Sequence, residues 1–462
     1  MSVSIGAARA FDTRFRVVVA GAGACGLVAA LAARDAGAGV LVLERDAVPG
    51  GSTALSSGFI PAAGTRWQRL ARVADSPERM AADIQRKNRG GADANVVAAV
   101  CAASAPTLEW LADAHAVRFV LVEGFLYPGH GAARMHAVPE KTGAGLMAAL
   151  LDACEHAGVD ILTSAHVDDV IATADGRVLG VGYGRPDGTR EAVGCDALVL
   201  ATSGFGGNAA MVREQLPAIA GATYFGHAGN QGDAIRWGAA LGADVRDLTA
   251  YQGHGSVATP HGILISWALM MEGGFQVNAR GERFSNEHLG YSEQCLPVLR
   301  QQGGFVWNVF DERLHRLGME FDDYRAAFAA GAIRTAASAA GLAALCDLPP
   351  AALAGTLEDV ARFAVGSRVD RHGRDFTGKP ALASPYHAVR VTGALFHTQG
   401  GLAVDANARV LRADGTPLPN LFAGGGSARG FSGPHVWGYL SGNGLLSAVV
   451  LGRLAGLTAA AT

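Results

Sequence analysis

The chain has 462 residues, of which 50% are hydrophobic and 17% charged, and its formal net charge is −3. A length of this kind predicts two or three domains with large cores, and the composition excludes a mostly disordered chain. The near balance of charge argues against a nucleic-acid-binding or membrane-surface protein, since both need a strongly basic face. The six cysteines are scattered without a C-x-x-C pair, so a disulfide framework, a metal site or a c-type haem is not expected.

Neither end of the chain has the pattern of a targeting or membrane segment. The first 15 residues lack the apolar stretch of a signal peptide. The apolar tail over 445–461 contains Arg453 and is too short to span a bilayer. We therefore expect a cytoplasmic protein with reduced thiols and no integral membrane segment.

The first elements form a strand–helix–strand unit. Residues 16–20 are an apolar run bounded by Gly21, and an Ala/Leu-rich helix is expected over 24–36, closed by Gly37. A second buried strand over 40–43 ends at Glu44. Because a helix connects the two strands within so few residues, the strands are predicted to pair in parallel.

The turn after the first strand predicts a dinucleotide site. Gly21, Gly23 and Gly26 match G-x-G-x-x-G, between a buried strand and a helix. In this pattern the first glycine permits the tight turn, the second lets the backbone approach a pyrophosphate, and the helix N-terminus supplies N–H donors. Glu44 ends the next strand, where a carboxylate can bind the ribose hydroxyls.

The loop over 49–58 favours a flavin over a nicotinamide dinucleotide. A Gly/Ser-rich loop directly after the second strand can wrap the rest of a flavin dinucleotide, whereas a simple NAD domain usually continues into a helix. The loop has no His, Cys or Tyr, so we expect a non-covalent cofactor. Its candidate cofactor contacts are Gly51, Ser52, Thr53, Ser57 and Gly58.

The composition and the predicted secondary structure change along the rest of the chain. Helical patterns cover 66–116 and 143–157, and strands are predicted over 161–172, 178–183 and 192–201 with Asp-Gly turns between them. Residues 249–379 are richer in aromatics and His, include an Ala-rich region over 324–345 that we expect to be helical, and are predicted to form an inserted second domain. After 380 the chain returns to short strands over 403–405 and 410–412, a glycine cluster and a terminal helix.

Four segments resemble the flavoprotein family of fumarate reductase, succinate dehydrogenase and the 3-ketosteroid dehydrogenases. They are the glycine unit, residues 50–58, residues 196–208, and residues 420–433 with the tail 438–456. The resemblance implies non-covalent FAD in an α/β, Rossmann-like domain with a parallel sheet and a β-meander, built from 1–248 and 380–462. It also implies an inserted α+β capping domain over 249–379 and an active site between the two.

The same resemblance assigns further FAD contacts. They are Val167 on the adenine side, Ala201, Gly204, Gly424, Gly425, Leu440 and Ser441. One position departs from the family, which often has an acidic residue where this chain has Gly426. The usual ribitol contact is therefore not expected there.

The expected active-site positions differ from those of fumarate reductases. In that family two His and two Arg bind the substrate dicarboxylate. His254 and His397 match the two histidines by their surrounding segments, whereas the two arginine positions fall at Tyr291 and Tyr439. Arg binds a carboxylate through two parallel hydrogen bonds, and a neutral phenol does not replace it in that task.

Residues 438–442 resemble instead the catalytic strip of ketosteroid Δ4-dehydrogenases. The resemblance implies an FAD-dependent dehydrogenase that introduces a C=C bond α,β to a ketone in a cyclic or steroid-like substrate. Tyr439 would hold the ketone oxygen, and Tyr291 would accept the α-proton with Ser441 or His254 as relay. Tyr127, in the aromatic loop 125–129, is a weaker candidate, and the cap aromatics Trp267 and Phe275 suit an apolar substrate. The direction, desaturation or enone reduction, stays open.

Three alternatives remain at this point. The first is an enzyme acting on a carboxylate, with Arg134 or Arg429 as the substitute anchor. The second is a flavin subunit that docks an electron-transfer partner, and the third is an NAD protein without flavin. We expect a small-molecule substrate. Because the chain has no haem or iron–sulfur motif, we expect the electron acceptor to be a separate molecule. The oligomeric state stays open.

Overall fold

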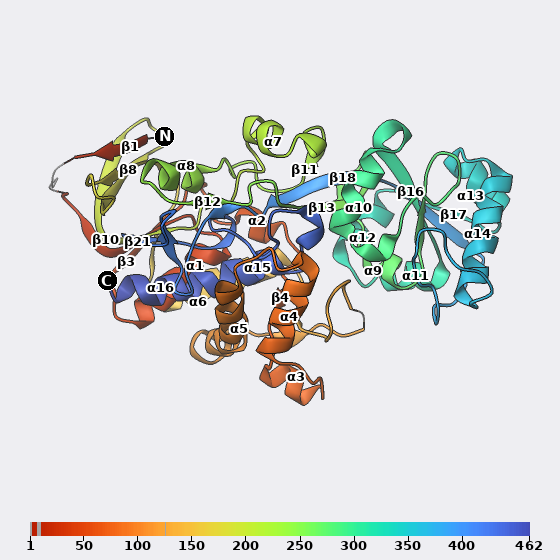
Figure 1. The fold of residues 1–462 in the computed structure, drawn as a ribbon, viewed down its shortest axis with the longest axis horizontal. Helices are drawn as coiled ribbons and strands as arrows, with labels where there is room; N and C mark the ends of the chain where they lie inside the picture. The colour runs from red at the N-terminus through yellow and green to blue at the C-terminus, as the bar shows by residue number, and fades with distance from the viewer. Residues whose placement is uncertain (1, 7–10, 125) are drawn as a thin grey trace.

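The computed structural model describes residues 2–6, 11–124 and 126–462 and has two lobes (Figure 1). The first lobe contains the N- and C-terminal segments, and the second, which we call the cap, contains the middle of the chain. This α/β arrangement confirms the predicted fold class.

A nine-stranded sheet organises the first lobe. Its main order is β1-β8-β9-β10-β2-β3-β7, and β21 and β20 continue from β10. β7, β3, β2, β10 and β21 are parallel, whereas β8, β9 and the first half of β10 form an antiparallel meander. The strands are β1 (Ser2–Ile5), β2 (Arg14–Ala20), β3 (Val40–Leu43), β7 (Asp160–Leu162), β8 (His166–Ala172), β9 (Val178–Gly184), β10 (Arg190–Leu200), β20 (Arg409–Leu411) and β21 (Pro417–Ala423).

Small residues let helices pack closely on this sheet. The first ten residues of α1 (Ala24–Asp35) are all buried. Where α1 crosses α16 (Gly452–Ala460), a Cβ at Gly456 would lie 2.1 Å from the carbonyl oxygen of Ala29. The excess of Gly and Ala in the sequence therefore serves partly to bring backbones together.

Further helices of the first lobe are α3 (Arg66–Leu70), α4 (Pro77–Asn88), α5 (Ala94–His115) and α6 (Gly143–His156). The helical regions predicted over 66–116 and 143–157 are thus confirmed, the first as three separate helices. By length and composition alone, α5 and the segment Asn443–Ala460 meet the requirement for crossing a bilayer, but half or more of each apolar stretch is buried in the protein.

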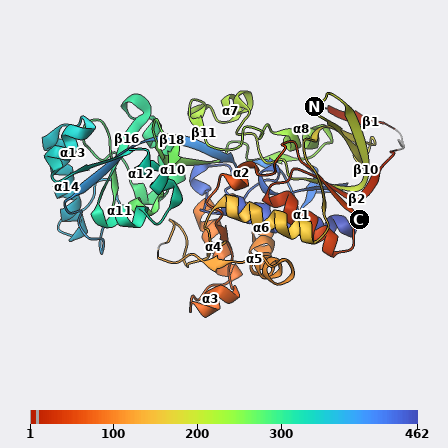
Figure 2. The ribbon, with the colours of Figure 1, turned by 180° about the vertical axis from the view of Figure 1, so that it is seen from behind.

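The cap is built on a seven-stranded sheet. Its order is β14-β13-β18-β16-β15, with β11 and β17 also paired to β18. The strands are β11 (Thr223–Tyr224), β13 (Tyr251–Ala258), β14 (Ile263–Leu264), β15 (Phe275–Val277), β16 (Phe305–Asp311), β17 (Ile333–Ala336) and β18 (Tyr386–Thr398). Views from both sides show β18 running between the lobes (Figure 2). The helices of the cap include α9 (Ala268–Met271), α10 (Tyr291–Leu299), α11 (Glu312–Gly318), α12 (Asp322–Ala329), α13 (Ala339–Cys346) and α14 (Pro350–Ala364).

Two local predictions were wrong. The Ala-rich region over 324–345 is not continuously helical, because α12 ends before Gly331, which has a φ of +74°, and β17 follows before α13. Pairing with β18 outweighs the helix propensity of the alanines there. Residues 403–405 do not form a strand, and Val404 makes only an isolated bridge to Val410.

Candidate active site

A groove lies where β2, β3 and β10 end. This is the edge at which parallel α/β sheets bind ligands. Ten of the predicted cofactor contacts line it: Gly21, Gly23, Glu44, Gly51, Ser52, Thr53, Val167, Ala201, Gly424 and Gly425. The structure therefore brings the glycine turn, the loop after β3 and the C-terminal glycine cluster together around one space.

The glycine turn has the geometry that its spacing predicts. Gly21 has a φ of +104°, and a Cβ at Gly26 would lie 1.8 Å from the carbonyl oxygen of Gly21. A Cβ at Gly23 would meet only the hydroxyl of Thr53, at 3.6 Å, so the backbone there faces the groove. The carboxylate of Glu44 accepts hydrogen bonds from the amide of Ala22 (2.8 Å) and that of Asp46 (2.9 Å), which fix it at the rim.

Polar atoms on the wall of the groove test whether a dinucleotide fits. Thr202 Oγ1, His166 Nε2 and Trp237 Nε1 are buried, line the groove and have no hydrogen-bond partner within the described ranges. The N-cap of α1 is Gly23, which has no side chain, and the amide of Ala24 donates to the hydroxyl of Thr53 at 3.2 Å. Buried polar atoms normally have partners, so these atoms fit the ribose, base and phosphate groups of FAD. Sequence analysis did not single out these three side chains, since nothing local marks them.

The missing acid at Gly426 has a steric explanation. A Cβ there would lie 2.7 Å from the backbone nitrogen of Gly204. The close approach of these two segments leaves no room for a side chain. The departure from the family pattern is thus part of the local packing.

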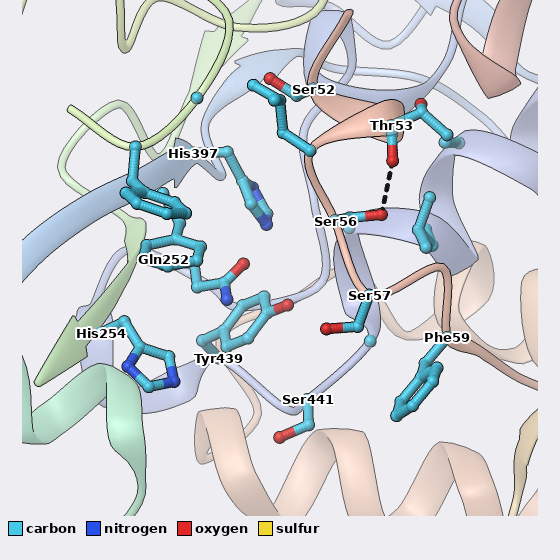
Figure 3. A pocket seen from close by; sticks show the side chains of 18 of the residues that line it. Ser52, Thr53, Ser56, Ser57, Phe59, Gln252, His254, His397, Tyr439 and Ser441 are labelled. Carbon is cyan, nitrogen blue, oxygen red and sulfur yellow. Dashed lines mark hydrogen bonds between the residues drawn. The ribbon is translucent and has the colours of Figure 1, made fainter. Parts of the chain in front are cut away.

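A larger cavity shares Ser52, Thr53 and Gly425 with the groove. It is lined by all the predicted catalytic residues and by the remaining loop contacts, namely Ser57, Gly58, His254, Tyr291, His397, Tyr439 and Ser441. Figure 3 labels Ser57, His254, His397, Tyr439 and Ser441 among them. Three predicted FAD contacts line neither space. Gly26 and Gly204 pack against backbone and Thr398, and Leu440 is only 1% exposed in the core.

The candidate catalytic side chains form one aromatic cluster. His254 stacks on Tyr291 with ring centroids 4.7 Å apart, and Tyr291 lies edge-on to Tyr439 at 6.2 Å. His397 packs edge-on against Tyr439 at 5.6 Å, and Tyr127 packs against Tyr291 at 6.0 Å. The cap supplies Tyr291 and His254, while Tyr439 comes from the C-terminal segment, so the cluster closes the boundary between the lobes.

Three hydroxyl groups form a connected chain in this cluster. Burial raises the pKa of Tyr291 well above its ordinary value, and its hydroxyl interacts with those of Ser441 and Tyr439. Burial also raises the pKa of Tyr439, whose oxygen accepts from Tyr291 and from the backbone amides of Gly442 and Gly444. Both tyrosines are therefore neutral phenols at neutral pH.

The two histidines are also neutral. Burial lowers the pKa of His254 to about 3 and that of His397 to about 4. Nδ1 of His254 accepts from the amide of Ser256 at 3.1 Å, and Nδ1 of His397 lies 2.8 Å from Nε2 of Gln399. With Nδ1 as acceptor, the ring hydrogen of His254 is on Nε2, so His254 is a neutral hydrogen-bond donor. Nδ1 of His397 also lies 3.4 Å from the carbonyl oxygen of Thr398.

Within the described residues, no Arg or Lys lines the larger cavity. The two arginines considered as substitute carboxylate anchors are engaged elsewhere. Arg134 is buried and pairs with Asp75 at 3.0 Å and Asp83 at 2.8 Å. Arg429 pairs with Asp247 at 2.6 Å. Neither lines either space, so the prediction that one of them could anchor a substrate carboxylate was wrong.

Other lining residues were missed or misplaced. Gln252, two residues before His254 on β13, points into the cavity, and Phe396 and Asp323 also line it. The alternation of β13 could have identified Gln252, whereas the sequence around Asp323 has no such signal. Trp267 lines the cavity as expected, but Phe275 is fully buried in a separate core cluster. Phe125 of the aromatic loop lies outside the described residues.

Residues 16–445 match the model of the FAD binding domain family. The chain belongs to this family. Its relatives include the cytochrome-type fumarate reductase of Shewanella frigidimarina, which is 27% identical over 96% of this chain and 76% of its own length. The 4-oxocyclohexanecarboxylate 2-dehydrogenase of Sinomonas cyclohexanicum is 26% identical over 96% of this chain and 93% of its own.

Among solved structures, this chain is similar to the 3-ketosteroid Δ4-(5α)-dehydrogenase of Rhodococcus jostii RHA1 in complex with 4-androstene-3,17-dione. The TM-score is 0.77, the identity 27%, and 99% of each chain is covered. The family and these relatives establish an FAD-dependent oxidoreductase that acts on CH–CH groups, which confirms the predicted cofactor and enzyme class.

Proposed function

We propose that the enzyme desaturates a neutral cyclic ketone, introducing a C=C bond α,β to the carbonyl. One observation carries the proposal: the cavity presents neutral donors and, within the described residues, no Arg or Lys. A dicarboxylate brought into such a cavity would lose its hydration without gaining a cation, which is costly. A ketone needs only hydrogen-bond donors at its oxygen.

Tyr439 is the proposed donor to the ketone oxygen. Its hydroxyl lies among the amides of Gly442 and Gly444, and its ring is held by His397 and Tyr291. Negative charge develops on the oxygen when the α-proton leaves, and a donor fixed in a dry site stabilises that charge strongly. The groove residues, among them Gly21, Gly23 and Glu44, would hold FAD, which would supply an acceptor for the hydride of the β-carbon.

The α-proton needs an acceptor, and because both tyrosines are neutral, no phenolate is present to take it directly. We infer that Tyr291 and Ser441 take it by relay: the α-proton passes to their hydroxyl pair while Tyr291 passes its proton to Tyr439. Tyr439 in turn gives its own proton to the carbonyl oxygen. The ketone becomes an enol and the side chains stay uncharged, in keeping with the raised pKa of both tyrosines. When the hydride leaves the β-carbon, the enol hydroxyl gives its proton back through Tyr439 to solvent, so the product is the neutral enone.

The electrons then leave to a separate acceptor. No group of three or more His, Cys, Asp or Glu side chains in the described ranges is placed to hold a metal ion. The sequence likewise has no haem or iron–sulfur motif, and the separate acceptor is part of this proposal.

The test is turnover by purified, FAD-loaded protein. Saturated cyclic ketones are offered under anaerobic conditions with an artificial dye acceptor, and succinate and fumarate are offered in parallel. The proposal expects ketone desaturation that falls about 100-fold in Tyr439→Phe with unchanged FAD content. Reduction of fumarate with no ketone turnover, or equal rates for the variant, would refute it.

A further inference from the structure

Asp323 is the one charged side chain among the described residues that line the larger cavity. It lies in the first turn of α12, next to Phe321, which also lines the cavity. The residue is exposed to solvent and also lines the cavity, so it lies at the mouth. No hydrogen bond or ion pair joins it to another described residue.

The packing of the next residue, Tyr324, fixes the position of Asp323. The neighbouring Tyr324 is fully buried, and its hydroxyl lies 2.8 Å from Nδ1 of His315. A Cβ at Gly318 would lie 2.8 Å from the ring of Tyr324, so α11 and α12 are in close contact at this point. The carboxylate is thus held on a packed helix and not on a loose loop.

The surroundings of Asp323 are apolar. Phe321, Leu264 and Trp267 line the same side of the cap. Although the residue is exposed, partial desolvation of its carboxylate raises the pKa of Asp323. A carboxylate in such a place gains a partner whenever a ligand brings a hydrogen-bond donor to it.

We propose that Asp323 selects substrates whose end remote from the reacting ketone carries a hydrogen-bond donor, an amine or a hydroxyl. The inference rests on the proposed ketone desaturation and deepens it. The same charge repels a substrate with a carboxylate at that end, since like charges in a partly desolvated cavity cost binding energy. Asp323 acts here as a specificity residue, and the reacting atoms stay with Tyr439 and Tyr291.

The test compares 4-substituted cyclohexanones with alkyl tails of two to eight carbons, each ending in an ammonium, a hydroxyl or a carboxylate. The comparison uses the full-length, FAD-loaded protein and two variants. Asp323→Asn removes the charge, and Asp322→Asn is the matched control because Asp322 is exposed, pairs with Arg325 and does not line the cavity.

At one or more tail lengths the wild type is expected to prefer ammonium over hydroxyl and hydroxyl over carboxylate in kcat/KM. Asp323→Asn is expected to weaken the preference for ammonium over carboxylate about threefold to tenfold, mainly through KM, and Asp322→Asn to leave it unchanged. The preference of the wild type should also decline as salt is added.

Two results overturn the inference. One is a preference that Asp323→Asn does not change at any tail length, and the other is an equal effect of Asp322→Asn. Failure of the proposed function is distinct, because it shows as no turnover of unsubstituted cyclohexanones by the wild type. Binding of the saturated tailed ketones, followed by the flavin absorption spectrum, gives a second readout of the same discrimination without turnover.

Discussion

The ammonium group of Lys87 contacts the carboxylate of Glu293 and lies 2.9 Å from the carbonyl oxygen of Leu289. Lys87 lies in the last turn of α4 in the first lobe, and Glu293 lies in the first turn of α10, two residues after Tyr291. Both side chains are only 15% exposed. The pair therefore ties the first lobe to the turn of the cap that carries Tyr291.

Lys87→Met is expected to destabilise the protein by about 3 kcal/mol, because it leaves the buried carboxylate of Glu293 without a partner. Burial already raises the pKa of Glu293, and Lys87 opposes that rise. The free energy of unfolding from urea titration measures the effect. The double variant Lys87→Met/Glu293→Gln should recover most of the loss, and a simply additive double variant would contradict the coupling.

Gly26→Ala is expected to abolish FAD binding, because a Cβ there meets the carbonyl oxygen of Gly21. Visible absorption of the purified protein measures the bound flavin. Gly39→Ala is the matched control, since a Cβ at Gly39 has no atom within 4 Å and should leave the yellow colour unchanged. A fully yellow Gly26→Ala protein would show that α1 and β2 do not need this close approach.

Tyr291→Phe and Ser441→Ala are each expected to slow ketone desaturation about 100-fold while FAD stays bound, since each breaks the relay of hydroxyls. Anaerobic bleaching of the flavin by the ketone measures the rate. Tyr183→Phe removes a hydroxyl that contacts Glu191 in the first lobe and serves as the control. Rates close to wild type in both site variants would remove these residues from proton transfer.

The pH dependence of activity should be flat between about pH 6 and 8. His254 and His397 are the cavity histidines, and their pKa values of about 3 and about 4 keep both neutral throughout this range. The neighbouring tyrosines remain protonated because burial raises their pKa. A bell-shaped kcat/KM profile with an inflection near 6.5 would contradict neutral histidines in the free enzyme.

Acid should destabilise the fold in a defined window. Burial lowers the pKa of His254 to about 3, and that of His130, His136, His288 and His397 to about 4. The unfolded chain therefore binds more protons than the folded one below about pH 6.5, so stability falls as pH drops from 6.5 towards 4. Thermal unfolding at a series of pH values tests this, and a constant Tm from pH 7 to 4.5 would disagree with it.

Much of the flavin groove was predictable from local sequence. Gly21, Gly23 and Gly26 need their particular backbone, and Glu44 follows a buried strand, so spacing and residue type were enough. Tyr291 and Tyr439, 148 positions apart, were paired only through the family resemblance. No periodicity relates them, because a cap inserted between two halves of a sheet joins distant segments.

What sequence missed depends on tertiary contacts. The roles of Arg134 and Arg429 were decided by the buried carboxylates beside them, which no local pattern shows. Asp323 faces the cavity only because Tyr324 anchors α12 against α11. The strand at Ile333–Ala336 forms because β18 offers it an edge, against the propensity of the alanines around it.

The single strand β18 has a mechanical consequence. From Tyr386 it pairs with β16 and β17 deep in the cap, and it ends by delivering His397 and Thr398 beside Tyr439 and the flavin groove. Hydrogen-bonded strands are stiff along their length, so tilting the cap would move the end of β18 and shift the imidazole of His397 away from the phenol of Tyr439. Any tilt of the cap large enough to admit substrate would therefore also separate His397 from Tyr439, which would link substrate entry to the alignment of these side chains.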